Sequence, residues 1–335
     1  MHNCTEGQRP GRSLLAQRHG HPYARPRSGQ LYARPGIGQL LKALIVNADD
    51  LGWTEGVNRG IAEAHRNGIL SSASLLANGT AFAGAVQLAR HETRLGVGVH
   101  LNLSDGPPIL PLWEVPSLVN GEGTLNGGPG TLFMGLLRGR LHLGEVEREW
   151  EAQVRKVRDA GIMPTHLDGH KHVHMLPGLF EIAVRIARRH GIRAIRVALE
   201  APPLSALLNK GAPPVVPGAA RRFTKALAVR GLGLLAMGAR DEARRAGLVT
   251  CDFFCGITQT GLLTESGVAA LLANLPPGLT ELMTHPGYAG EELRRTRTRL
   301  QDSRQAELAI LTAPGIRNLV ASQGIRLLHY GLAAA

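Results

Sequence analysis

The chain has 335 residues, 44% of them hydrophobic and 4% aromatic, and a formal net charge of +12. This length allows one large α/β domain or two small ones. No run of about 18 apolar residues suggests a membrane-spanning helix, and the first residues lack the apolar stretch of a signal peptide. Three cysteines argue against a disulfide framework, so a cytoplasmic protein is favoured.

The amino-terminal residues 1–40 are expected to form a disordered basic tail. Residues 1–39 hold six arginines and one glutamate, are rich in Gly, Pro and Gln, and lack helical or strand periodicity. Such a tail can contact polyanions, but no nucleic-acid-binding motif is visible and stacking aromatics are rare. We therefore expect no specific nucleic-acid partner, and a single domain over residues 41–335.

Strands and helices are predicted to alternate from residue 42 onward. Apolar runs predict strands over 42–48, 69–78 and 95–103, and amphipathic patterns predict helices over 54–68 and 81–92. Thr54 is a plausible N-cap of the first helix. This βαβαβ order indicates a parallel sheet with right-handed crossovers.

The alternation continues after a loop-rich stretch over residues 104–143. A helix is predicted over 144–161, with an apolar stripe formed by Val146, Trp150, Val154 and Val157. Residues 163–170 are expected to run from a strand into a loop, a helix should follow over 177–191, and another strand over 192–198.

Residues 201–250 interrupt this order with a Pro-rich link and Leu/Ala-rich, Arg-studded helical sequence. They are predicted to be a helical insertion that caps the α/β domain, or alternatively to touch a membrane surface or lipidic substrate through residues 218–246. Cys251 and Cys255 are expected to be buried structural thiols rather than zinc ligands. A strand beginning at 280, a helix over 304–324 and a strand over 325–331 complete the chain.

Four predicted strands end in acidic or histidine residues. Asp49 and Asp50 follow the first strand, His100 ends the third, "THLDGHKHVH" spans residues 165–174, and His285 follows the strand from residue 280. In parallel α/β proteins the carboxyl ends of the strands form one face, so these residues should converge. Two histidines and one carboxylate suit a catalytic divalent metal.

Each of these residues also has an ordinary structural explanation. An aspartate between strand and helix commonly caps the helix, a lone histidine at a strand end is commonly a half-buried hydrogen-bonding residue, and a histidine before Pro-Gly is commonly a turn residue. The occurrence of all four at strand ends favours a metal site. If Asp50 binds the metal, the neighbouring Asp49 can accept a proton from the attacking water.

The histidine-rich stretch raises its own alternatives. His170, His172 and His174 would point to one side if the stretch were extended, but one ligand with supporting partners is favoured over three ligands. Asp168 either orients a histidine from behind or caps a turn. His166 is expected to be structural.

Several motifs together resemble the YdjC-like carbohydrate deacetylases, which include the chitooligosaccharide deacetylases. These are "LIVNADDLGWTEGVNRGIAEAHRNGILSSASLLANG", "GVGVHLNLSDGPP", "PTHLDGHKHVHMLP" and "LMTHPGY". The resemblance implies a distorted TIM-barrel-like (β/α) fold and hydrolysis of N-acetyl groups from sugars with one Mg²⁺ or Zn²⁺ ion. It assigns Asp50, His100 and His170 as metal ligands, Asp49 as general base and His285 as the acid that protonates the leaving amine.

The sequence departs from short carbohydrate-specific members in two places. Leu51 stands where an aromatic residue is common and is expected to change one wall of the pocket. Residues 201–250, with the following "CDFFCGITQTG", resemble the hopanoid-associated branch, which acts on a glucosamine-bearing lipid. The expected substrate is therefore an acetylated amino sugar, either an oligosaccharide or a glycolipid such as an N-acetylglucosaminyl hopanoid.

Other functions stay open at this point. They are a different metal-dependent amidohydrolase or phosphoesterase, a nucleic-acid-binding protein that uses the basic tail, and an enzyme peripheral to a membrane. A homodimer is also compatible with the sequence.

Overall fold

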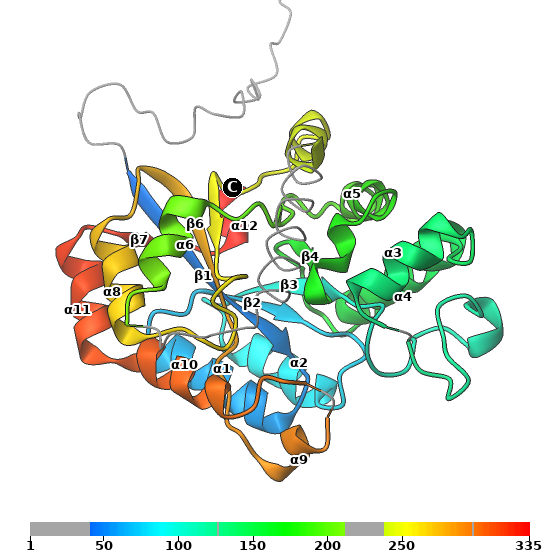
Figure 1. Cartoon of the computed structure of the whole chain (residues 1–335), viewed down its shortest axis with the longest axis horizontal. Coiled ribbons are helices and arrows are strands. Elements are labelled where there is room, and N and C mark those ends of the chain that lie inside the picture. Colours follow the sequence, from blue (N-terminus) through cyan, green and yellow to red (C-terminus); the bar gives the residue numbers. More distant parts are fainter. Residues whose placement is uncertain (1–40, 126, 212–237, 297) are drawn as a thin grey trace, which may run out of the picture.

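The computed structural model describes residues 41–125, 127–211, 238–296 and 298–335 (Figure 1). The predicted tail over residues 1–40 lies outside the described residues. So do residues 212–237, which form most of the segment proposed for lipid contact. The helical prediction for residues 201–250 is met at both ends of that region, by α6 (Pro202–Leu208) and by a helix over 238–245.

A seven-stranded parallel sheet lies at the centre of the fold (Figure 1). The strand order is β4-β3-β2-β1-β6-β5, and β7 also pairs with β1. In chain order the strands are β1 (Lys42–Leu51), β2 (Ser72–Leu75), β3 (Gly96–Leu101), β4 (Leu167–Gly169), β5 (Phe253–Cys255), β6 (Gly278–Thr284) and β7 (Arg326–Leu327).

Strand β1 is the longest strand and is buried along nearly its whole length. Its apolar half, Ala43 to Val46, is fully inaccessible to solvent, as expected of a strand covered on both faces. It pairs in register with β6 from Lys42 to Ala48 and with β2 from Asn47 onward. This central position places the polar carboxyl end of β1 between two neighbouring strands.

Isolated bridges close the sheet into a distorted barrel. Leu167 N donates to Ala194 O, Ile195 N donates to Val249 O, and Ala201 N donates to Phe254 O. Residues 194–201 therefore connect β4 to β5, the two ends of the strand order. The prediction of a distorted α/β barrel with parallel strands is confirmed, but a continuous strand over 192–198 is wrong, because this segment forms only isolated bridges, Ala194 with Val249 and Ile195 with Leu167.

Helices cover the outside of the sheet (Figure 1). The longer ones are α1 (Glu55–Asn67), α2 (Phe82–His91), α3 (Pro129–Leu137), α4 (Leu143–Asp159), α5 (Leu179–Arg189), α8 (Glu265–Ala273), α10 (Asp302–Thr312) and α11 (Pro314–Ser322). Shorter turns of helix are η1 (Leu112–Glu114), η2 (His170–Met175), α9 (Glu291–Arg294) and α12 (Tyr330–Ala333). Helix α3 and η1 lie within the stretch expected to be loop.

Local sequence signals explain several of these elements. Val57 N donates to Thr54 Oγ1 at 3.2 Å, which confirms the predicted N-cap of α1. The four residues of the predicted α4 stripe are all fully buried. The single helix expected over 304–324 is instead two helices, because Pro314 has no N–H to donate and begins α11.

Two expectations about the chain as a whole can be compared with the described residues. Cys251 and Cys255 are free and buried, as expected of structural thiols. Across the described ranges, no helix is long and apolar enough to cross a membrane.

Candidate metal centre

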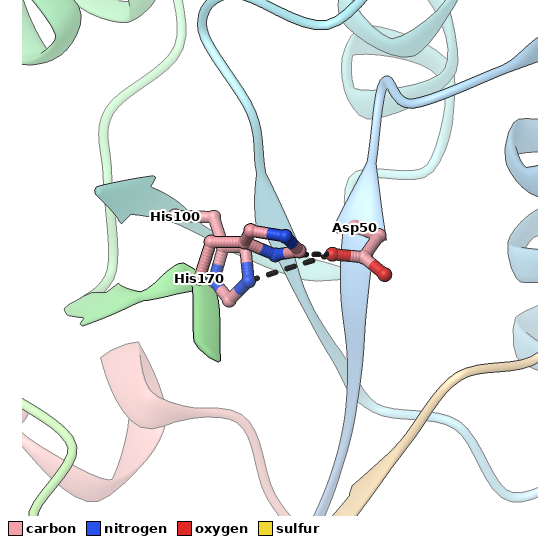
Figure 2. A group of neighbouring side chains, drawn as sticks. All are labelled: Asp50, His100 and His170. Atoms are coloured by element: carbon pink, nitrogen blue, oxygen red, sulfur yellow. Dashed lines mark ion pairs between the residues drawn. The ribbon is translucent and has the colours of Figure 1, made fainter. Parts of the chain in front are cut away.

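The strand-end residues do converge at the carboxyl edge of the sheet. Asp50 lies near the end of β1, His100 belongs to β3, and His170 follows directly after β4. Figure 2 shows the three side chains pointing toward one another from these separate elements. His285 follows β6 and lines one cavity together with Asp50, His100 and His170.

Three donor atoms face a common point. Asp50 Oδ1 lies 3.0 Å from His170 Nδ1 and 3.6 Å from His100 Nε2, and all three potential ligand atoms lie within 4.8 Å of one another. Asp50 Oδ1 is buried and has no hydrogen-bond partner among the described residues. A buried carboxylate oxygen without a partner, facing two ring nitrogens, fits a divalent cation bound by two nitrogens and one oxygen.

The other oxygen of Asp50 is held by an arginine. Arg304 Nη2, from α10, donates to Asp50 Oδ2 at 2.6 Å, and both side chains are almost inaccessible to solvent. Burial acts to raise the pKa of Asp50, but Arg304 and His170 hold it well below its usual range. Asp50 is therefore charged at neutral pH.

His100 is held from behind by Asp168. His100 Nδ1 lies 2.7 Å from Asp168 Oδ1, so Nε2 is the nitrogen that faces Asp50. Burial acts to lower the pKa of His100, but Asp168 and Asp49 raise it to about 9. Of the two expectations for Asp168, contact with a histidine is the one observed. A metal ion at this site has to displace the proton of His100.

Asp49 belongs to a buried ion cluster centred on Arg196. Arg196 donates to both carboxylate oxygens of Asp49, at 2.7 and 2.9 Å, and also lies 2.7 Å from Asp168 Oδ2 and from Glu281 Oε1. Burial acts to raise the pKa of Asp49, but Arg196 and His100 lower it. Asp49, His100 and Asp168 also lie within metal-binding distance of one another, yet Arg196 already supplies their positive charge.

The histidine-rich stretch is not extended. Strand β4 ends at Gly169, η2 follows, and Lys171 and His172 have positive φ of 52° and 56°. His170, His172 and His174 therefore do not share one side. The three histidines diverge because the chain turns at the first of them.

His172 and His174 occupy different surroundings. His172 lines the cavity and lies edge-on to Phe254, with ring centroids 5.9 Å apart. His174 Nε2 lies 3.1 Å from the carbonyl oxygen of Arg196. His166 is fully buried, stacks on Tyr330 at 4.1 Å, and is not among the residues that line the cavity. This placement agrees with a structural role for His166.

The cavity above the donor atoms has a volume of about 420 Å³. Besides the strand-end residues, its lining includes Trp53, Asp105, Ile257, Met283, Arg299 and Leu300. The expectation that Leu51 forms one wall is wrong, because Leu51 is fully buried in the core and Trp53 lines the cavity instead.

His285 lines this cavity and has one ring nitrogen without a hydrogen-bond partner among the described residues. Its backbone N–H donates to Glu307 Oε2 at 2.6 Å, while its ring Nδ1 has no hydrogen-bond partner among the described residues. Burial lowers the pKa of His285 to about 4. The imidazole is therefore neutral at pH 7 in this structure.

Three residues of the site were missed by sequence reasoning: Asp105, Arg196 and Arg304. Arg196 lies in a predicted buried strand, where an arginine is unusual, and this was the only signal for it. Arg304 lies on a helix far along the chain, and Asp105 lies in a loop. Nothing in the local pattern separates either of them from ordinary surface residues.

Comparison with known proteins shows which family this chain is similar to. The model of the family described as "YdjC-like protein" matches residues 43–322. A carbohydrate deacetylase of Brevibacillus brevis is 31% identical, over 86% of this chain and 98% of its own length. A chitooligosaccharide deacetylase of Enterobacter sp. is 32% identical, over 85% and 97%.

A solved structure has a similar fold. The crystal structure of a provisionally named cellobiose-phosphate cleavage protein from Enterococcus faecalis superimposes with a TM-score of 0.68 and 25% identity, covering 88% of this chain and 100% of that one. The family match spans most of the chain and includes every strand-end residue described above, so the chain belongs to the YdjC-like protein family.

Proposed function

We propose that this protein is a metal-dependent carbohydrate deacetylase that hydrolyses the N-acetyl group of an amino sugar. The observation that carries the proposal is the convergence of Asp50, His100 and His170 beside Asp49 in one cavity. The relatives named carbohydrate deacetylase and chitooligosaccharide deacetylase align over most of the chain, which supports the same chemistry here.

The proposed ligands of one Mg²⁺ or Zn²⁺ ion are Asp50, His100 and His170. When bound, such an ion supplies Lewis acidity, which activates water and stabilises the developing oxyanion of amide hydrolysis. The residues themselves prepare the site before any ion enters. Arg304 keeps Asp50 charged and fixed, and Asp168 directs Nε2 of His100 inward.

Asp49 is the proposed general base. It lines the cavity and lies next to the proposed ligand Asp50, and its low pKa keeps it deprotonated at neutral pH. The paired contacts from Arg196 fix the plane of the carboxylate. A base held in one orientation loses less entropy when it meets the attacking water.

His285 is the proposed carrier of the proton that returns to the leaving amine. Because the imidazole is neutral in the resting site, the proton has to reach it during the reaction. The proton that Asp49 removes from water is available for this step. His172 lines the same cavity and is proposed to meet the substrate, whereas His174 is proposed to support the backbone of Arg196.

The proposed substrate is an N-acetylglucosamine oligosaccharide or an N-acetylglucosaminyl lipid such as a hopanoid. If the substrate is the lipid, we propose that this protein is cytoplasmic and binds the membrane surface through residues 218–246. A homodimer stays part of the proposal as well. These alternatives are separated by substrate choice, by liposome binding and by the mass of the protein in solution.

A mass-spectrometric screen tests the proposal. The full chain, loaded with Mg²⁺ or Zn²⁺, is incubated with N-acetylglucosamine oligomers and with N-acetylglucosaminyl lipids, and loss of one acetyl group is scored. We expect a deacetylated product from one class, and none from Asp49→Asn at equal metal occupancy. If neither class reacts at full metal occupancy, the deacetylase assignment fails.

Two alternatives from the sequence are less well supported. Two-metal phosphoesterases need a second set of free carboxylates, whereas Arg196 occupies the second carboxylate cluster of this site. We therefore expect one metal ion per chain by elemental analysis. A nucleic-acid-binding function would depend on residues 1–40, and deleting them should leave deacetylation unchanged.

A further inference from the structure

The two proposed histidine ligands present opposite ring nitrogens to Asp50. His100 uses Nε2 and has Asp168 behind its Nδ1 at 2.7 Å. His170 uses Nδ1, and its Nε2 lies 3.2 Å from Asp105 Oδ2. Each ring therefore has a carboxylate at the nitrogen that faces away from the proposed metal position.

The two carboxylates differ in their surroundings. Asp168 is fully buried and shared with Arg196, whereas the side chain of Asp105 is 23% exposed and lines the cavity. Asp105 Oδ2 also accepts from Ser104 Oγ at 3.0 Å and from Lys171 Nζ at 2.5 Å. Asp105 Oδ2 thus lies close to polar atoms of three residues, Ser104, His170 and Lys171.

Lys171 connects Asp105 to the turn that carries His170. It directly follows His170 and has a φ of 52°, a conformation that is uncommon for residues other than glycine. Its ammonium group returns to Asp105 from this turn. The backbone after His170 and the carboxylate behind its ring are therefore connected by one ion pair.

The loop that carries Asp105 is held independently of the Asp105 side chain. The carbonyl oxygen of Asp105 accepts from Asn78 Nδ2 at 2.9 Å and from Asn102 Nδ2 at 2.8 Å. Asn102 Oδ1 in turn accepts from the backbone N–H of Ser104. Replacing the carboxylate at residue 105 should therefore leave the course of the loop intact.

We propose that Asp105 is a positioning residue for His170. Asp105 holds the imidazole ring so that Nδ1 presents its lone pair to the proposed metal ion, and Lys171 anchors Asp105 in this role. A neutral imidazole whose Nε2–H donates a hydrogen bond to a carboxylate has its lone pair on Nδ1. His170 Nε2 has no aligned hydrogen bond within the described residues, so the proposal rests on the 3.2 Å distance between His170 Nε2 and Asp105 Oδ2. The inference rests on the metal site of the proposed function.

Zinc titration of the full chain tests this role without any substrate. The EDTA-treated, dialysed protein and its variants are titrated with Zn²⁺ by calorimetry, and His170→Ala defines binding outside the site. We expect Asp105→Asn to weaken zinc binding by roughly 10–100-fold, as for other partners of metal-bound histidines. Lys171→Met should weaken zinc binding less than Asp105→Asn does. Ser104→Ala should weaken it least of the three, because it removes only a neutral hydrogen-bond donor.

Thermal unfolding of the metal-free proteins separates positioning from folding. The metal-free Asp105→Asn variant should unfold at the wild-type temperature, and Asp105→Ala replaces it in the titration if it does not fold. Wild-type zinc affinity in the folded Asp105 variant would overturn the proposal, as would wild-type protein that binds zinc no better than His170→Ala. A protein that binds zinc through His170 but deacetylates nothing would instead refute the proposed function alone.

Discussion

Asp50 has a backbone conformation that few aspartates adopt. Its φ is 69°, and the register between β1 and β2 shifts between Ala48 and Leu51. Successive side chains of a regular strand point to opposite faces, but an irregularity of this kind re-aims a side chain. Asp49 and Asp50 can therefore both line the cavity, one beside Arg196 and the other beside Arg304.

At the same scale, His170 and His166 offer a sharp contrast within five residues. His170→Ala removes one of three converging donor atoms, so metal affinity should fall by more than the roughly 10–100-fold lost with an outer partner. His166→Ala removes a buried ring stacked on Tyr330, so it should keep the metal and lose stability, by about 1–3 kcal/mol. Metal content after dialysis and urea unfolding measure the two effects. A metal-free His166→Ala protein that is still folded would contradict this division.

Helix α1 packs closely against the loop that carries His285. A Cβ added at Gly60 would lie 2.5 Å from Gly287 Cα, and one added at Gly56 would lie 2.7 Å from Tyr288 O. Both neighbours are backbone atoms, which cannot move aside without shifting the loop. The two glycines thus allow a helix from the amino-terminal half to position the "HPGY" loop from the other end of the chain.

Gly60→Ala should therefore destabilise the protein although alanine favours helix. The overpacking should cost about 1–3 kcal/mol, against a helix-propensity gain of about 1 kcal/mol. Gly144→Ala is the matched control, because Gly144 lies in α4 and its added Cβ would meet only Arg148 Nη1 at 3.7 Å. The control should be neutral or stabilising in thermal unfolding. Equal melting temperatures for the two variants would show that the close approach is not rigid.

Helix α10 contributes a buried acid, Glu307, which accepts from the backbone of His285 and of Gly261. Burial raises the pKa of Glu307 to about 7, although the hydrogen bond from His285 opposes this. The folded protein therefore holds a proton here that the unfolded chain releases at lower pH. Its stabilising effect is complete below the unfolded pKa of 4.5 and is lost as pH rises toward 7.

Glu307→Gln should remove this pH dependence. Relative to wild type, the variant should gain about 2 kcal/mol or more of unfolding free energy between pH 5 and pH 8. Any constant cost of the new amide group cancels in this difference. Urea unfolding of the metal-free proteins at the two pH values measures it, and parallel pH profiles for wild type and variant would rule out a raised pKa.

Across the whole molecule, Arg196 connects the strands that form the site. Its guanidinium contacts Asp49 of β1, Asp168 of β4 and Glu281 of β6. Glu281 is in turn hydrogen-bonded by the Tyr330 hydroxyl near the carboxyl terminus. Arg196 itself lies in the segment whose isolated bridges close the barrel. One buried cation therefore contacts three carboxylates at the place where the sheet closes.

Arg196→Lys should lower stability and activity together. A single ammonium group cannot reproduce the forked contacts of a guanidinium with several carboxylates, and breaking buried ion pairs costs about 3–5 kcal/mol. Arg189→Lys is the control, because Arg189 contacts two glutamates at a half-exposed position and should unfold like wild type. An Arg196→Lys midpoint equal to that of the control would mean that charge alone, and not geometry, holds the cluster.

The sequence predicted more of the fold than of the contacts that surround the candidate site. Alternating apolar strands and amphipathic helices predicted the parallel barrel, because burial imposes these periods on the sequence. The same logic placed Asp50, His100 and His170 at one edge. It failed where the chain has no period of its own: residues 192–198 form isolated bridges rather than the predicted strand.

The sequence by itself determined the family and the fold class and placed the three proposed metal ligands at one edge of the sheet, because each of these depends on short motifs or on the carboxyl ends of strands. The tertiary structure decided what surrounds them: Arg304 behind Asp50, Arg196 across Asp49, and Asp105 behind His170. These contacts join residues 65 to 254 positions apart. No local period records such a pairing, because the chain segments that form it meet only when the barrel has closed.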